Sequence, residues 1–123
     1  MSAEPVRLLF ERMEARDWET AAAQLHEDVV FDWPHSGERI RGLENFMAIQ
    51  RNYPDGWHID VLRVAEAGNA VAAEVRVDHG ETSFYCAGFY ELRDGRISAG
   101  TEYWVEARSE EPPAWRARWT ERP

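Results

Sequence analysis

The chain has 123 residues, a length that suits one compact domain, and 44% of them are hydrophobic, including six tryptophans. The formal net charge is -9 and all 14 basic residues are arginines without a basic run, which argues against nucleic acid and anionic membranes as partners. The apolar stretches fall far short of the roughly 20 residues that span a bilayer, and the start MSAEPVRLLF lacks the pattern of a secretory leader. We therefore expect a cytoplasmic protein.

The first half of the chain has mainly helical periodicity. Apolar residues at i, i+3, i+4 and i+7 from Val6 predict a helix over residues 5–16. Asp17 is suited to cap a second, short helix, and the run DVVFDW predicts a strand that ends at Pro34. The run GLENFMAIQRNYP predicts a third helix that stops before Pro54.

The second half is rich in β-branched and aromatic residues. The runs WHIDVLRVAE, AVAAEVRVD, SFYCAGFYEL and RISAGTEYWVE predict four consecutive antiparallel strands. Turn residues separate them at Gly68, at Gly80 and at the dipeptide of Asp94 and Gly95. Helices followed by a strand meander are typical of an α+β domain, which we place at residues 1–106.

Residues 107–123 form a tail in which two adjacent prolines argue against a further strand. Trp115 and Trp119 lie four residues apart and form one edge of a short helix if the segment is helical. Docking of this edge on the same subunit or on a neighbour, and a mostly disordered end, are both open on the sequence.

Cysteine and histidine are used sparingly. Cys86 is the single cysteine and lies in the apolar run FYCAGFY, so we assign it to packing and expect no disulfide. The four histidines have no spacing typical of metal ligands, so no metal site is expected.

Three stretches, ARDWETAAAQLHEDVVFDWP, RIRGLENF and ELRDGRISAGTEYW, resemble the nuclear transport factor 2-like superfamily, in its SnoaL-like, ketosteroid-isomerase-like and limonene-epoxide-hydrolase-like branch. The resemblance implies a cone in which three N-terminal helices pack on a strongly curved antiparallel β-sheet around an apolar pocket. It also implies a homodimer formed through the sheet and chemistry without a cofactor. Because this fold hosts many reactions, the site residues have to decide the activity.

The resemblance to the epoxide-hydrolase branch implies a catalytic set of Asp78, Arg76 and Glu102, with the arginine holding two carboxyl groups as acid and base. Glu102 would lie beside Trp104, whose apolar ring favours a raised carboxyl pKa. For AEVRVDHG the alternation of a strand leaves two orientations open. Either Arg76 and Asp78 face the pocket and the neighbouring valines line the dimer interface, or the valines face the core and the charged row faces solvent.

The large number of aromatic side chains predicts a pocket for a small apolar or cyclic molecule. We expect it to be lined by Phe10, Phe31, Trp33, Phe46, Trp57, Phe84 and Trp104, with His35 and Tyr53 as polar groups. The expected function is a cofactor-independent enzyme for epoxide hydrolysis or polyketide-type cyclisation or isomerisation. The alternative is a non-catalytic ligand-binding or dimerisation module. Steroid-type isomerisation is disfavoured, because Leu9 and Trp33 stand where that branch has a tyrosine and an aspartate.

Overall fold

The computed structural model describes residues 2–123. The elements follow in the order α1 (Glu4–Glu14), α2 (Trp18–Ala22), β1 (Leu25–Trp33), β2 (Glu38–Arg41), α3 (Leu43–Asn52), β3 (Trp57–Ala67), β4 (Ala70–His79), β5 (Thr82–Arg93), β6 (Arg96–Glu106) and the 3-10 helix η1 (Ala114–Trp119). The three helices and the later strands match the predicted order. β2 is an additional strand, whose four residues ERIR are too short and too polar to give a strand pattern.

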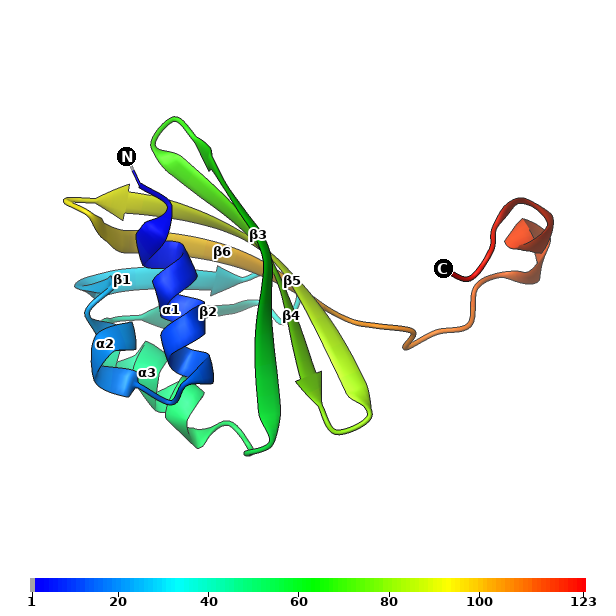
Figure 1. The fold of residues 1–123 in the computed structure, drawn as a ribbon, viewed down its shortest axis with the longest axis horizontal. Coiled ribbons are helices and arrows are strands. Elements are labelled where there is room, and N and C mark those ends of the chain that lie inside the picture. The colour runs from blue at the N-terminus through cyan, green and yellow to red at the C-terminus, as the bar shows by residue number, and fades with distance from the viewer. Residues whose placement is uncertain (1) are drawn as a thin grey trace.

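One six-stranded sheet organises the molecule, with the strand order β2-β1-β6-β5-β4-β3. β3 to β6 form the predicted antiparallel meander. β1 joins it by pairing in parallel with β6, so strands from the two halves of the chain lie side by side. Figure 1 shows the curved, open sheet with α1, α2 and α3 on its concave side, which is the cone-shaped α+β fold predicted from the sequence.

The hydrophobic core lies between the helices and the concave face of the sheet. The predicted stripe of α1 is buried there, with Val6 and Leu9 fully inaccessible. Asp17 caps α2 by accepting a hydrogen bond from the backbone N–H of Thr20 at 3.2 Å, as predicted. Cys86 is buried in the same core, and burial raises the pKa of its thiol, which agrees with its assignment to packing.

The C-terminal arm, defined as residues 107–123, leaves the end of β6 and extends away from the body of the molecule (Figure 1). It consists of an extended stretch followed by η1. Among residues 2–123, no helix combines the length and the apolar composition needed to cross a membrane.

Candidate active site

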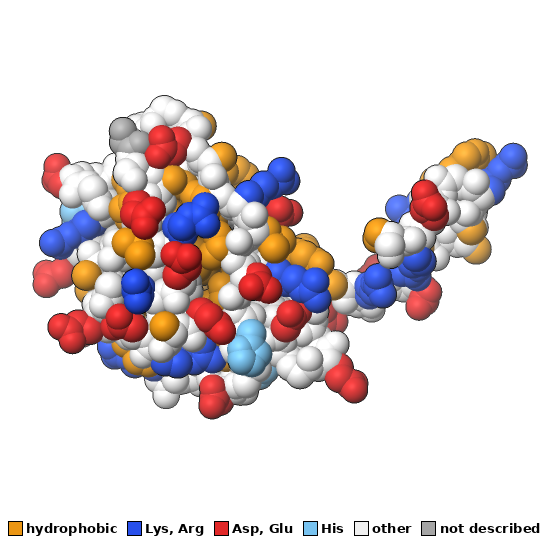
Figure 2. Space-filling model, viewed as in Figure 1, with side chains coloured by type: hydrophobic (Ala, Val, Ile, Leu, Met, Phe, Trp, Pro, Cys, Tyr) orange, Lys and Arg blue, Asp and Glu red, His pale blue; other side chains and the backbone are white. Residues whose placement is uncertain are grey.

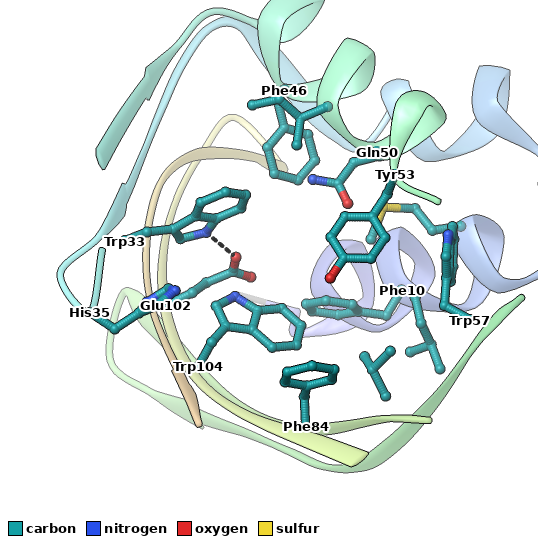
Figure 3. A pocket seen from close by; sticks show the side chains of 14 residues that line it. Phe10, Trp33, His35, Phe46, Gln50, Tyr53, Trp57, Phe84, Glu102 and Trp104 are labelled. Atoms are coloured by element: carbon teal, nitrogen blue, oxygen red, sulfur yellow. Dashed lines mark hydrogen bonds between the residues drawn. The ribbon is translucent and has the colours of Figure 1, made fainter. Parts of the chain in front are cut away.

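A cavity of about 210 Å³ lies at one end of the cone, between α1, α3 and the concave face of the sheet. Figure 3 shows its wall, which is largely aromatic with one carboxyl group pointing inward. The lining residues are Phe10, Met13, Trp33, His35, Phe46, Ile49, Gln50, Tyr53, Trp57, Ile59, Val77, Phe84, Glu102 and Trp104. A cavity of this size and composition fits a compact, mainly apolar molecule.

Eight of the nine residues expected to line the pocket do so. Phe31 is the exception and is corrected here: it is fully buried behind the pocket wall and stacks on Phe46 with ring centroids 4.3 Å apart. Sequence reasoning missed five lining residues, which are Met13, Ile49, Gln50, Ile59 and Val77, and the amide of Gln50 is a polar group of the wall. Strand alternation gives Val77 an inward position in one of the two orientations of β4, whereas no sequence pattern marks Gln50 as a pocket residue.

Glu102 is the buried carboxyl group of this site, with 3% of its surface exposed. β6 places it on the concave face, as the alternation of the strand requires. The indole N–H of Trp33 donates to its Oε1 at 2.9 Å, and the hydroxyl of Tyr90 donates to its Oε2 at 2.6 Å. Two neutral donors from β1 and β5 therefore fix the carboxyl group in one orientation.

The environment of Glu102 favours its protonated form. Burial raises the pKa of Glu102 above the usual value of 4.5, and the hydrogen bonds from Tyr90 and Trp33 oppose that rise in part. Burial and the adjacent Glu102 raise the pKa of Tyr90 well above 10, so its hydroxyl stays a donor. The carboxyl group therefore changes its charge at a higher pH than an exposed glutamate, as a proton-transfer group working near neutrality requires.

Two glycines make room for the Tyr90 side chain. A Cβ atom at Gly88 would lie 2.1 Å from the Tyr90 hydroxyl oxygen. A Cβ atom at Gly100 would lie 2.7 Å from the ring of Phe31 and 3.0 Å from the ring of Tyr90. Glycine at both positions thus permits the hydrogen bond between Tyr90 and Glu102. On the sequence Tyr90 is assigned to packing, although a glycine inside the strand run CAGFY signals the close approach of another group.

Further polar groups lie around the carboxyl group. The buried indole N–H of Trp104 faces Glu102 (Figure 3) and lowers its pKa, although the two groups fall short of the geometry of a full hydrogen bond. The hydroxyl of Tyr53 points into the cavity. His35 is exposed at the mouth, where its ring lies 6.3 Å from that of Trp33.

Arg76 and Asp78 lie outside this site, which corrects the expectation that they face the pocket. Their side chains form an ion pair, with 2.9 Å between Arg76 Nε and Asp78 Oδ1, and each is about 40% exposed. A hydrogen bond from Ser83, followed by that from Arg76, lowers the pKa of Asp78, so this carboxyl group is the opposite of a raised-pKa acid. The structure therefore separates Glu102 from the two residues expected to work with it.

The reason is the alternation of β4 in a sheet with one face buried. Val75 is fully buried and Val77 lines the cavity, so Arg76 between them and Asp78 after them must point outward. In register, Glu102 pairs with Gly88 and Gly88 pairs with Ala73, so the β4 position level with Glu102 holds a methyl group. The valines therefore belong to the core, and the expectation that they line a dimer interface is also corrected.

The comparisons with known proteins agree with this geometry. Residues 6–100 match the model of the SnoaL-like domain. The chain belongs to the SnoaL-like domain family. No curated protein matches the sequence.

Several solved structures are similar to this SnoaL-like domain. A provisionally assigned ketosteroid isomerase from Kribbella flavida is 33% identical, with a TM-score of 0.88 over 98% of this chain and 87% of that one. A nuclear transport factor 2-like protein of unknown function from Burkholderia xenovorans is 26% identical, with a TM-score of 0.81 over 98% and 93%. An LEH-like epoxide hydrolase from M. tuberculosis is 25% identical, with a TM-score of 0.70 over 83% and 80%.

The pocket of this SnoaL-like domain is thus lined by one carboxyl group, that of Glu102. Among residues 2–123, no three histidine, cysteine, aspartate or glutamate side chains are grouped so as to hold a metal ion. What the site offers is a shielded proton acceptor, the hydroxyl of Tyr53 and an apolar wall. These parts suit proton transfer to or from a small molecule.

Proposed function

We propose that this protein is a cofactor-independent enzyme that moves a proton on a small, largely apolar carbonyl compound, with Glu102 as the acid-base group. The observation that carries the proposal is the position of Glu102. It is 3% exposed, fixed by Trp33 and Tyr90, and directed into an aromatic cavity. Isomerisation and ring closure through an enolate are the reactions that such a site serves.

In the proposed reaction the Glu102 carboxylate takes a proton from the carbon next to the substrate carbonyl. The C–H bond breaks, its electron pair becomes the enolate, and the proton resides on Glu102. Each carboxylate oxygen retains a lone pair beyond its hydrogen bond to Trp33 or Tyr90, so the group can act as a base. Such a general base contributes roughly a hundredfold to ten-thousandfold in rate.

The developing oxyanion would accept a hydrogen bond from the Tyr53 hydroxyl, which points into the same cavity. The proton on Glu102 then returns to a different carbon, which isomerises the substrate. Alternatively, the enolate carbon attacks a second carbonyl group of the same molecule, which closes a ring, and the proton goes to the new alkoxide. Neither outcome consumes an oxidant or a reductant.

Epoxide hydrolysis ranks below these reactions for this chain. The arrangement expected for it needs a second carboxyl group and an arginine at the pocket, and Arg76 and Asp78 are on the outer face. The likeness to the M. tuberculosis epoxide hydrolase therefore supports the fold more than that reaction.

A non-catalytic ligand-binding module is the second candidate. It is favoured by the fact that both oxygens of Glu102 already accept hydrogen bonds from the protein. In that case Glu102 would serve to orient Trp33 and Tyr90, and the cavity would only bind its ligand.

Exchange of α-protons for deuterium separates the two candidates. Small cyclic ketones and enones are incubated with the protein in heavy water and followed by NMR, while ligand-observed NMR reports binding. We expect exchange with the wild type and at least a hundredfold slower exchange with Glu102→Gln, with binding retained.

Asp78→Asn is the matched control, since it makes the same carboxyl-to-amide change on the outer face of the sheet. It should leave exchange within about twofold of the wild type. Binding of a ketone without exchange would favour the ligand-binding module. Equal exchange by the wild type and Glu102→Gln would end the catalytic assignment.

A further inference from the structure

The C-terminal arm makes little contact with the body that it leaves. The backbone N–H of Ala107 donates to the carbonyl of Ser83 at 2.8 Å, where the arm begins. Beyond that point the hydrogen bonds and the ion pair found within residues 108–123 join arm residues to one another, as in the pair of Arg122 with Glu111. Figures 1 and 2 show the arm projecting clear of the domain.

The arm nevertheless has the composition of a binding segment. Trp115 and Trp119 are 72% and 69% exposed, an unusual state for two indole rings in one short element. Arg116 and Arg118 lie over these rings, at 5.9 and 4.7 Å from the ring centroids. Tryptophan and arginine are the residues most enriched at the energetic centres of protein interfaces.

Two solved relatives share the arm. The matches to the Kribbella and Burkholderia structures cover 98% of this chain, a share that residues 1–106 cannot reach without the arm. The M. tuberculosis structure and five others cover 83–85%, which the body alone accounts for. The arm is therefore a feature common to the more similar structures of this comparison.

The outer face of the sheet carries an apolar surface beside the root of the arm. We define the outer patch as the outward-facing residues Tyr85, Ala87, Phe89, Tyr103 and Val105 of β5 and β6. Phe89, Tyr103 and Val105 are 54%, 46% and 58% exposed. In Figure 1 the arm leaves on the side of the sheet away from the helices, which is the side of this patch.

Charge favours contact between the arm and the body of another molecule. Residues 1–106 contain 20 of the 23 acidic residues and 10 of the 14 arginines, so two bodies repel each other. The arm holds the other four arginines and three glutamates, which gives it a formal charge of +1 against -10 for residues 1–106. A basic, tryptophan-bearing arm therefore complements an acidic body with exposed aromatic residues.

We propose that the arm docks Trp115 and Trp119 on the outer patch of a second copy of this chain, so that two copies exchange arms. The exchange covers the two tryptophans and the outer patch together, so these two exposed surfaces become each other's partner. It requires no change within the body, and it goes beyond the enzymatic proposal, on which it does not depend.

Sedimentation equilibrium of the full chain tests the exchange with two variants. The arm variant is Trp115→Ser with Trp119→Ser, and the patch variant is Phe89→Thr with Tyr103→Thr. We expect the wild type to approach twice the 14.3 kDa of the chain at micromolar concentration. Each variant should raise the dissociation constant at least about thirtyfold, as loss of a central interface contact does.

An equimolar mixture of the two variants gives the decisive result. A hybrid dimer restores one intact contact, between the normal arm of one chain and the normal patch of the other, whereas either variant alone has none. The mixture should therefore dimerise more tightly than either variant alone. Trp115→Phe with Trp119→Phe is the conservative control and should keep most of the dimer.

Far-UV circular dichroism should show that each variant retains the wild-type fold, as expected for exposed side chains. A wild type that stays at 14.3 kDa would overturn the proposal, as would an arm variant that dimerises like the wild type. A mixture that is no tighter than its separate components would also overturn it.

Discussion

Glu102 is the residue whose ionisation couples the pocket to the stability of the fold. Burial gives its carboxyl group a higher pKa in the native state than in the unfolded chain, where the usual value is 4.5. Well below pH 4.5 both states hold the proton and the group has no net effect. As the pH rises from there through the raised pKa, the unfolded state releases its proton first, and the native state loses stability.

Glu102→Gln removes this titration while keeping the size of the side chain. We expect the free energy of unfolding of the variant to increase relative to that of the wild type as the pH rises through this window. The increase should be about 1.4 kcal/mol for each pH unit between the unfolded-state and native-state pKa values of Glu102. Urea unfolding at a series of pH values measures the difference. A difference that stays constant over the window would show that the native pKa is not raised.

At the scale of single elements, Arg16 joins the end of α1 to the start of β3 beneath the pocket. Its guanidinium group donates to the carbonyl oxygens of Met13 and Glu14, which close the helix, and to the carbonyl oxygen of Trp57 at 2.7 Å. The same group lies 3.4 Å from the centroid of the Trp57 ring, which lines the cavity. Arg16 has a φ of 60°, a left-handed conformation that a side chain seldom adopts.

Substitutions of Arg16 separate the contribution of its side-chain contacts from the cost of its left-handed backbone. Arg16→Ala should lower the free energy of unfolding by about 1–2 kcal/mol, because it loses the stacking and the hydrogen bonds and keeps the strained backbone. Arg16→Gly should cost less than Arg16→Ala, since glycine accepts the positive φ. Arg16→Lys keeps the charge without the planar fork and should still weaken the contact with Trp57. Thermal or urea unfolding ranks the three, and an alanine variant as stable as the glycine variant would contradict this account.

The elements also show what the sequence can and cannot predict. The period of α1, the cap at Asp17 and the turn at Gly95 depend on neighbours in sequence, and the structure contains all three. The site depends on contacts between distant strands. Glu102 faces Tyr90 because of a pairing register that local patterns do not encode.

Arg76 is a second case in which local sequence patterns do not determine where a side chain lies. Strand alternation and the resemblance pointed in opposite directions for this residue, and packing of the neighbouring valines against the core decided its orientation. The aromatic pocket was easier to predict, because so many large apolar side chains in a small domain must gather around the concave face.

At the scale of the whole molecule, the body and the arm differ in how many hydrogen bonds hold their backbones. β5 lies between β4 and β6 and is hydrogen-bonded on both edges. Within residues 108–123, the one backbone hydrogen bond found outside the interior of η1 is donated by Arg116 to the carbonyl oxygen of Pro113, and it stays within the arm. We expect amide hydrogen exchange to be slowest in β5 and fast throughout the arm, when measured at concentrations where the chain is monomeric. Protected arm amides under those conditions would indicate docking on the arm's own body.

The parallel pairing of β1 with β6 sets the order in which the chain can be completed. During synthesis on the ribosome, β1 emerges some seventy residues before the strand beside which it finally lies. Until β6 is made, the first strand can pair with β2 and the helices can collapse on it, but the sheet stays divided into two parts. Closing that gap brings together contacts of high sequence separation, the kind that slows folding in small domains. Because Glu102 lies on β6 and Trp33 on β1, assembly of the pocket is the same late event as the joining of the two halves.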